Sequence, residues 1–182
     1  MSQYNPEKNR FVRVSDYISH IIVDLKYATT ENFTGKPIYS FSEAWLRYGT
    51  VQKLATVQAE LQKLGYGLKI WDAFRPVAAQ FALWEVRPNP VFIANPYAGY
   101  SNHSRGNAVD VTLVDLNGYE VVMPTEFDSL FDIQKCQDLR ALEAAKLLHN
   151  AMTKAGFKAL PEEWWHFTDE DSYAVEKEFI PK

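Results

Sequence analysis

Two histidines and one aspartate stand in patterns that suit metal binding. His103 and Asp110 belong to the stretch SNHSRGNAVD, and His166 follows the run EEWW. Together they supply three nitrogen and oxygen donors, the number that a catalytic zinc takes while one position stays open for water. Taken alone, Asp110 could instead bond to loop amides, and His166 could be a packed core histidine. His20 and His149 lack comparable neighbours and are interpreted as structural.

Glu163 and Arg75 have the residue types that metal-assisted hydrolysis needs beside the ligands. Glu163 stands three residues before His166 and could take a proton from water. Positions 163 and 166 of a regular strand face opposite sides, so Glu163 must lie at a bend or at the start of its strand. Arg75, followed by the restrictive Pro76, suits a fixed cation that steadies negative charge on a tetrahedral intermediate. The alternative is a surface arginine or a salt bridge to Asp72.

The strand expected at residues 107–114 places Asp110 in otherwise apolar surroundings. Strand alternation puts Asp110 on one face with Ala108 and Thr112, while the apolar residues between them face the other side. A carboxylate at this place is costly unless a cation or several donors satisfy it. The chain has no HExxH motif, so it has no helix-borne zinc protease site of that kind.

Interleaved helices and strands are expected to position these residues. Apolar spacing and β-branched runs predict strands at residues 20–28, 67–74, 107–114 and 163–168, helices at 51–64, 77–85 and 139–155, and a short helix near the C-terminus. Asn117-Gly118 predicts a two-residue hairpin turn into a strand at 119–123, which requires antiparallel pairing. We therefore expect an α+β fold with a central, mostly antiparallel sheet and flanking helices.

The composition predicts one domain over residues 1–182. With 47% hydrophobic and 23% charged residues, the chain is long enough to bury a core and too short for two ordinary domains. The net charge of −4, without any Lys/Arg run, argues against nucleic-acid and membrane-surface partners. The single cysteine, Cys136, excludes an intramolecular disulfide and fits a reducing compartment. The first residues lack the apolar segment of a signal peptide, so the expected location is the cytoplasm.

Two motifs resemble those of a known peptidase family. The pattern Ser-x-His-x-x-Gly-x-Ala-x-Asp at 101–110 and the run Glu-Trp-Trp-His at 163–166 are similar to the zinc D-alanyl-D-alanine dipeptidases of the vancomycin-resistance type. That group lies within a wider family of D,D-carboxypeptidases and related peptidoglycan peptidases. Residues 24–29, 32–37 and 72–76 also resemble it, and the Tyr-Ala-Thr and Asn-Phe-Thr-Gly segments point to the dipeptidase branch. The resemblance runs from about residue 20 to residue 168.

The resemblance implies a fold, a reaction and a set of site residues. The fold would be a single zinc peptidase domain like those of hedgehog and D,D-peptidases, and the reaction would be hydrolysis of D-alanyl-D-alanine to two D-alanines. One Zn²⁺ would bind to His103, Asp110 and His166, with Glu163 as general base and Arg75 as transition-state stabiliser. The dipeptide site would be lined by Ser101, Tyr27 and Asp128, and Asp128 would pair with the substrate ammonium.

Two other functions compete with this interpretation. A D,D- or L,D-carboxypeptidase or endolysin would act on longer wall peptides, which calls for an open groove and normally for export or a wall-binding module. A non-catalytic zinc-binding module, as in hedgehog-like signalling domains, would need neither Glu163 nor Arg75. The loop at residues 87–101, which contains three prolines, is a candidate wall for a small closed pocket, or else an ordinary surface connection.

Overall fold

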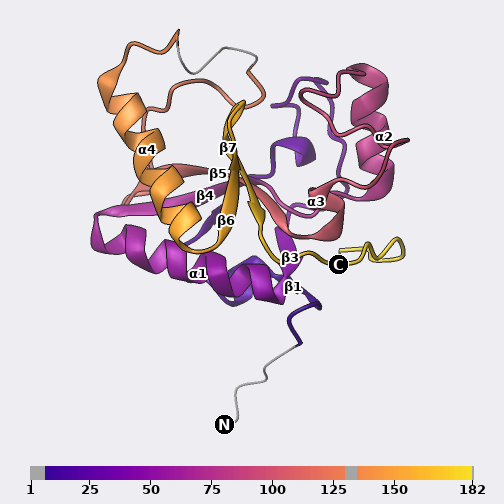
Figure 1. Cartoon of the computed structure of the whole chain (residues 1–182), viewed down its shortest axis with the longest axis horizontal. Helices are drawn as coiled ribbons and strands as arrows, with labels where there is room; N and C mark the ends of the chain where they lie inside the picture. Colours follow the sequence, from indigo (N-terminus) through magenta and orange to yellow (C-terminus); the bar gives the residue numbers. More distant parts are fainter. Residues whose placement is uncertain (1–6, 130–134, 182) are drawn as a thin grey trace.

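Five strands form a central, mostly antiparallel sheet. The computed structural model describes residues 7–129 and 135–181. The strand order is β2-β4-β5-β7-β6. The three inner strands β4 (Tyr66–Asp72), β5 (Ala108–Asp115) and β7 (Glu163–Asp169) pair antiparallel, as does the edge strand β6 (Phe157–Leu160), whereas the other edge strand, β2 (Ile22–Val23), runs parallel to β4. Helices flank this sheet (Figure 1), which confirms the predicted α+β fold.

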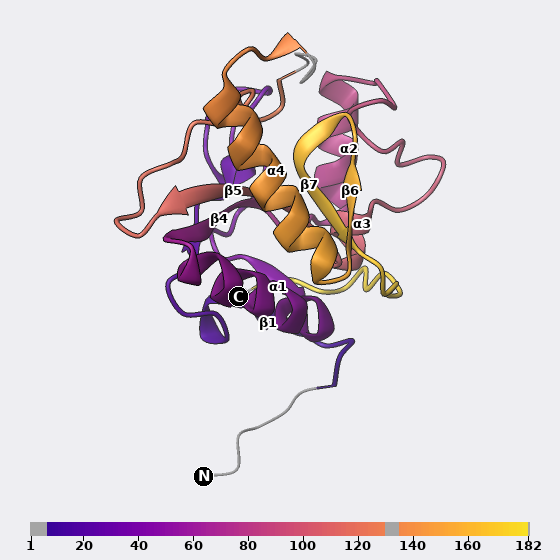
Figure 2. The ribbon, with the colours of Figure 1, turned by 60° about the vertical axis from the view of Figure 1, so that its left-hand side comes forward.

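Two long helices, α1 (Tyr48–Lys63) and α4 (Leu139–Lys154), pack against each other and against the sheet. Figure 2 shows α4 on the near side of β6 and β7, with α1 below it. Leu54 and Leu61 recur at helical spacing and are fully buried in α1. Gly65 and Gly156 follow the two helices with positive φ angles of 85° and 91°, so each helix ends at a left-handed glycine as the sequence predicts.

The elements that surround the site lie on the opposite side of β7 from α4. They are α2 (Val77–Val86), the one-turn α3 (Asn102–Arg105) and the loop at residues 87–101 (Figure 1). In β5 the fully buried Val109, Val111 and Leu113 alternate with Asp110 and Thr112, so the sheet presents an apolar face and a face with polar side chains. A separate two-stranded sheet pairs β1 (Phe11–Arg13) with β3 (Trp45–Arg47).

The strand predicted over residues 20–28 is wrong for most of its length. Ile22 and Val23 alone pair there, with Lys69 and Ile70 of β4. The preceding His20 has a φ of 61°, outside the extended range. Residues Lys26–Ala28 form a 3-10 turn instead of continuing the strand. Local turn hydrogen bonds therefore replace the sheet ladder despite a β-branched and aromatic composition.

The hairpin after β5 differs in its length from the prediction. The turn contains three residues, 116–118, because the Asp115 N–H bonds with the Tyr119 carbonyl at 2.8 Å. Gly118 has a φ of 88°, as a three-residue hairpin with a left-handed glycine requires. The strand predicted at 119–123 is reduced to one antiparallel bridge between Val114 and Glu120.

The short helix predicted near the C-terminus is also wrong, since the described residues 170–181 contain no helix. Arg47, only 1% exposed, pairs with Glu176 and donates to the Ala174 carbonyl at 2.6 Å. The Phe179 ring stacks on Phe11 with centroids 4.0 Å apart. Tertiary contacts therefore hold this tail in a non-helical conformation.

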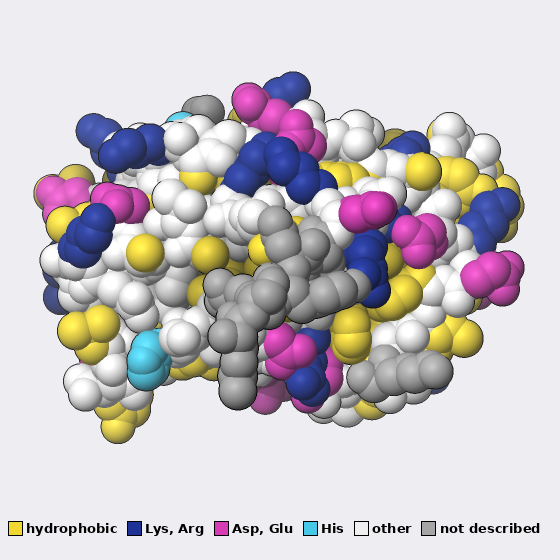
Figure 3. Space-filling view, turned by 90° about the horizontal axis from the view of Figure 1, so that it is seen from below, with side chains coloured by type: hydrophobic (Ala, Val, Ile, Leu, Met, Phe, Trp, Pro, Cys, Tyr) yellow, Lys and Arg dark blue, Asp and Glu magenta, His cyan; other side chains and the backbone are white. Residues whose placement is uncertain are grey.

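The surface of the described residues carries mixed charges. Figure 3 shows one face, on which Lys and Arg side chains lie among Asp and Glu, so this face has no field of a single sign. Within residues 7–129 and 135–181, no helix combines the length and the apolar character needed to cross a membrane.

Candidate metal centre and active site

Three candidate metal donors converge from α3, β5 and β7. Ser101 caps α3 by accepting the His103 N–H at 3.2 Å. Gly106 ends that turn with a φ of 77°, and β5 then carries Asp110 back toward His103. Asp110 stands directly opposite His166 in the antiparallel pairing of β5 and β7, which puts both side chains on one face of the sheet.

The three donor atoms form a compact triangle. Oδ1 of Asp110 lies 2.9 Å from Nδ1 of His166 and 3.5 Å from Nε2 of His103, and the two nitrogens are 3.3 Å apart. A tetrahedral zinc with ligand bonds of about 2.0–2.2 Å separates its ligands by about 3.3–3.6 Å. The separations of 3.3 and 3.5 Å match this range, and the 2.9 Å between Asp110 and His166 is below it, so those two side chains would move slightly apart around a bound zinc. The number and type of the donors suit a tetrahedral cation with one position open. Within the described residues, no other group of three His, Cys, Asp or Glu side chains has this arrangement.

Each histidine is oriented by a hydrogen bond at its other ring nitrogen. Nδ1 of His103 lies 2.8 Å from the Ala73 carbonyl, and Nε2 of His166 lies 3.1 Å from the Thr168 hydroxyl. Such partners fix the tautomer and the ring orientation of metal-binding histidines. Burial alone would raise the pKa of Asp110, but the neighbouring His103 and His166 hold it below its usual range.

Glu163 is the first residue of β7 and lies where the pairing with β6 is irregular. Ala159 pairs with Phe167, but Leu160 pairs with Glu163 instead of His166. The strand start and this irregularity fulfil the geometric condition set for Glu163 by the sequence. Its Oε2 lies 3.9 Å from Nδ1 of His166. Burial, reinforced by the charge of Asp110, raises the pKa of Glu163 to about 8.

Arg75 both makes the salt bridge to Asp72 and lines the cavity beside the metal donors. Its Nε and Nη2 donate to Oδ2 of the fully buried Asp72 at 3.1 and 2.6 Å. The other carboxylate oxygen accepts the Tyr39 hydroxyl at 2.7 Å and the Ala73 N–H at 2.9 Å. The two interpretations of Arg75 left open by the sequence are thus compatible, because the ion pair fixes a cation that still reaches the cavity.

All the site residues predicted from the sequence line one cavity of about 220 Å³. They are Tyr27, Arg75, Ser101, His103, Asp110, Asp128, Glu163 and His166. The loop at 87–101 supplies part of the wall through Pro90, Val91, Phe92 and Ala94, so it is more than a surface connection.

Asp128 and Tyr27 form a polar pair in this cavity. The Tyr27 hydroxyl donates to Oδ2 of Asp128 at 2.8 Å. Asp128 has a φ of 57°, which is uncommon for a residue other than glycine. Burial raises the pKa of Asp128 to about 7. Burial makes the Asp128 carboxylate costly to ionise, and a nearby positive charge offsets that cost. The position therefore suits contact with a cationic group of a ligand.

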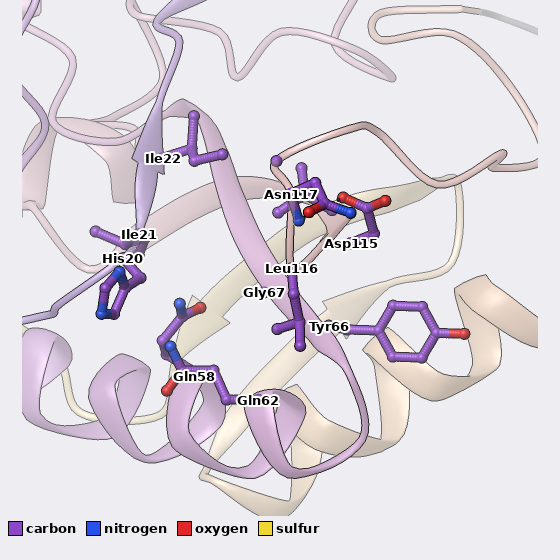
Figure 4. A pocket seen from close by; sticks show the side chains of 12 residues that line it. His20, Ile21, Ile22, Gln58, Gln62, Tyr66, Gly67, Asp115, Leu116 and Asn117 are labelled. Carbon is purple, nitrogen blue, oxygen red and sulfur yellow. Dashed lines mark hydrogen bonds between the residues drawn. The ribbon is translucent and has the colours of Figure 1, made fainter.

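A larger cavity, of about 510 Å³, lies at the other end of β4 and β5. Figure 4 shows Gln58 and Gln62 of α1 beside Tyr66 and Gly67 of β4, with His20 at its margin. None of the predicted site residues lines this cavity.

Three side chains that support the site were missed by the sequence analysis: Tyr39, Gln80 and Thr168. Thr168 follows His166 by two residues, and strand alternation could have placed both on one face. Gln80 follows Arg75 by five residues, within the first turns of the helix predicted at 77–85. Tyr39 comes from an irregular segment, and no local pattern connects it with Asp72.

The chain matches one protein family over nearly all its length. The family model Peptidase_M15, described as D-ala-D-ala dipeptidase, matches residues 7–181. The chain is 38% identical over 149 residues to the D-alanyl-D-alanine dipeptidase of Escherichia coli K12, covering 80% of this chain and 77% of that protein. Identity to the D-alanyl-D-alanine dipeptidase of Enterococcus faecalis is 30%, covering 88% and 91%, and to that of Streptomyces coelicolor 32%, covering 87% and 90%.

A solved structure shares the fold. It is the LdcB LD-carboxypeptidase, which matches with a TM-score of 0.50 at 21% identity and covers 97% of this chain and 72% of that chain. The resemblance predicted from the motifs at 101–110 and 163–166 is confirmed by the family match and by the curated relatives. Over residues 7–181, the chain belongs to the metallopeptidase family Peptidase_M15, described as D-ala-D-ala dipeptidase.

Proposed function

We propose that this chain is a zinc dipeptidase that hydrolyses D-alanyl-D-alanine to two D-alanines. The observation that carries the proposal is the cavity of about 220 Å³, which the metal donors, Glu163, Arg75 and Asp128 all line. Pockets for drug-sized ligands span about 300–1,000 Å³, so this cavity suits a substrate of two small residues. The names of the relatives from three bacteria support the same substrate.

His103, Asp110 and His166 would hold one Zn²⁺ through the three atoms that form the triangle. The chemistry that zinc supplies in such a site is polarisation of the scissile carbonyl and a lowered pKa of the attacking water. Glu163 takes the proton from that water and later delivers it to the leaving amine. Arg75 stabilises the negative charge that develops on the carbonyl oxygen.

The two ends of the dipeptide have partners in the cavity. Asp128 pairs with the ammonium group of the substrate. The Tyr27 hydroxyl, by donating to Asp128, holds the side chain of Asp128 in place. The oxygen of Ser101 accepts the His103 N–H, so its hydroxyl hydrogen can donate to the substrate carboxylate. A cavity with one partner for each charge favours a free zwitterionic dipeptide over an internal segment of a longer peptide.

One comparison of two substrates tests the proposal. Purified protein loaded with zinc is offered D-alanyl-D-alanine and, separately, an N-acetylated tripeptide ending in D-Ala-D-Ala. We expect release of D-alanine from the dipeptide and little from the tripeptide, because acetylation removes the charge that faces Asp128 and adds bulk. The reverse preference would favour the D,D- or L,D-carboxypeptidase alternative. Failure to cleave either substrate would favour a zinc-binding module without activity.

We further propose that residues 1–182 form one zinc peptidase domain that acts in the cytoplasm. The free cysteine Cys136 supports a reducing compartment. In that compartment the reaction would remove D-alanyl-D-alanine as part of antibiotic resistance, or recover D-alanine derived from the cell wall.

A further inference from the structure

Gln80 is a buried amide that connects Arg75 with the loop that walls the cavity. It lies in the first half of α2 and is 1% exposed. Its Oε1 accepts Nη1 of Arg75 at 2.9 Å, and its Nε2 donates to the Ala94 carbonyl at 2.7 Å. A single side chain therefore bonds a cavity cation on one side and the middle of the loop at 87–101 on the other.

The hydrogen bonds to Arg75 leave a defined part of its guanidinium available. A guanidinium has five N–H groups. One carboxylate oxygen of Asp72 accepts the N–H of Nε and one N–H of Nη2. The side-chain oxygen of Gln80 accepts one N–H of Nη1. Among the described residues, one N–H on each terminal nitrogen thus has no protein acceptor, and Arg75 lines the cavity. Asp72 binds the edge formed by Nε and Nη2, and Gln80 binds the remaining nitrogen, Nη1, so the two acceptors hold different parts of the planar group.

The carbonyl of Ala94 lies between two local turns of the loop. The Ile93 N–H bonds to the Asn89 carbonyl at 3.0 Å, and the Ala98 N–H bonds to the Asn95 carbonyl at 3.0 Å. These bonds shape the loop internally but do not join it to α2. The bond from Gln80 makes that connection, beside an edge-to-face ring contact between Phe81 of α2 and Tyr97 of the loop, whose centroids are 5.1 Å apart. Ala94 itself lines the cavity.

We propose that Gln80 is a positioning residue that sets the plane of Arg75 and at the same time holds the loop at 87–101 against the cavity. The proposal rests on the proposed function in so far as it assigns Arg75 to transition-state stabilisation. Its consequence is that turnover and selectivity for short substrates depend on one residue that touches no substrate.

Two substitutions separate the two bonds. Gln80→Met keeps the length of the side chain and removes both hydrogen bonds. Gln80→Glu keeps an acceptor for Arg75 and loses the donor to Ala94. Gln58→Met is the matched control, because Gln58 is also a buried glutamine, 3% exposed, whose Oε1 accepts the Leu68 N–H at 2.8 Å. Gln58 lines the distant cavity of Figure 4.

We expect Gln80→Met to retain zinc and to lower kcat for D-alanyl-D-alanine by roughly 10- to 100-fold. The upper value is the loss of rate that a shift of about 1 Å in a catalytic group, here the Arg75 guanidinium, can cause. Gln80→Glu should restore most of kcat while KM rises about fivefold, the effect of one lost neutral hydrogen bond. Hydrogen exchange of the amides at 87–101 should be faster in both Gln80 variants. Gln58→Met should lower Tm without changing kcat, KM or exchange in that loop.

The proposal is overturned if zinc-loaded Gln80→Met keeps wild-type kcat and loop exchange. It is also overturned if Gln58→Met, at an equal loss of Tm, lowers kcat as much, since that pattern reports stability alone. Failure of the proposed function is recognised separately, because wild-type protein would then leave D-alanyl-D-alanine intact. In that case the exchange measurement still decides whether Gln80 holds the loop.

Discussion

Glu163 lies beside the metal donors without being one of the three, so removing its carboxylate should separate metal binding from turnover. Glu163→Gln keeps the size and the hydrogen-bonding capacity of the side chain but cannot take a proton. We expect zinc content and Tm to stay near wild type while kcat falls by about 10²–10⁴-fold. Zinc stoichiometry measured beside kcat checks this.

The neighbouring, exposed Glu162 provides the control for that experiment. Glu162→Gln should leave both quantities unchanged. Loss of zinc from Glu163→Gln would make Glu163 a ligand, and retained activity would place the base elsewhere, with Glu162 as the first candidate.

Thr168 should affect metal affinity through His166. Its hydroxyl lies 3.1 Å from Nε2 of His166, and loss of such a partner typically costs about 10–100-fold in metal affinity. Thr168→Val should therefore weaken zinc binding in a competition titration against a chelator. Thr112→Val is the control, because the buried Thr112 hydroxyl, also in the central sheet, has no hydrogen-bond partner among residues 7–129 and 135–181. Equal affinities of the two variants would show that Thr168 does not orient the ligand.

Asp128 should give substrate binding a pH dependence. Its pKa, raised to about 7 by burial, means that the carboxylate becomes protonated as the pH falls through 7, and its attraction for an ammonium group is then lost. KM for D-alanyl-D-alanine should thus increase between pH 7.5 and 6. Asp128→Asn should have a high KM that changes little over this range. Parallel KM profiles for the two proteins would show that another group binds the ammonium.

The residues that carry the chemistry could be predicted because their types are specific. Few combinations of His, Asp and Glu suit a metal and a base, and such residues recur with recognisable neighbours. Gln80, Thr168 and Tyr39 act through hydrogen bonds to other side chains, and their types serve many purposes in proteins. Only the folded geometry, such as the 2.7 Å bond from Tyr39 to Asp72, shows which of them matter.

At the scale of elements, the connection between α3 and β5 depends on Gly106. Its φ is 77°, and an added Cβ would lie 2.3 Å from Cε1 of Phe11. A left-handed conformation alone costs a residue with a side chain about 1–2 kcal/mol. Gly106→Ala should lower the free energy of unfolding by more than this, because the clash with Phe11 adds to the conformational cost. It should also weaken zinc binding, since His103 and Asp110 flank the turn.

Gly35→Ala is the control for that experiment, because it introduces the cost of a left-handed backbone without a steric clash. Gly35 has a φ of 67°, and nothing lies within 4 Å of an added Cβ. Denaturant unfolding of both variants should therefore show a smaller loss for Gly35→Ala, with no change in zinc affinity. Equal losses would mean that the Phe11 ring moves aside at little cost.

Elements with long, regular patterns could be predicted, and those held by distant contacts could not. The strands β4, β5 and β7 and the helices α1 and α4 agree closely with their apolar spacing. In contrast, β1 and β3 have three residues each and exist through their mutual pairing. The C-terminal residues contact Arg47 and Phe11, far away in the sequence, and no local pattern reports such contacts.

For the whole molecule, metal binding should add to stability because the donors come from three elements. Zinc at about 100 times its Kd stabilises a folded protein by roughly 2.7 kcal/mol. For chains of about 150–250 residues, Tm changes by about 2–4 °C per kcal/mol. Calorimetry should therefore show Tm falling by roughly 5–11 °C when a chelator removes the metal. His103→Ala should show no such response, and a wild-type Tm insensitive to the chelator would contradict the assignment.

The edges of the five-stranded sheet have a consequence for association between copies of the chain. One edge is β2, with two paired residues, and the other is β6, whose four residues end in an irregular register at Leu160 before Pro161. Long, regular edge strands invite another chain to continue the sheet, and short strands, bulges and prolines prevent this. The fold thus offers a poor template for intermolecular β pairing, and so for aggregation through its sheet.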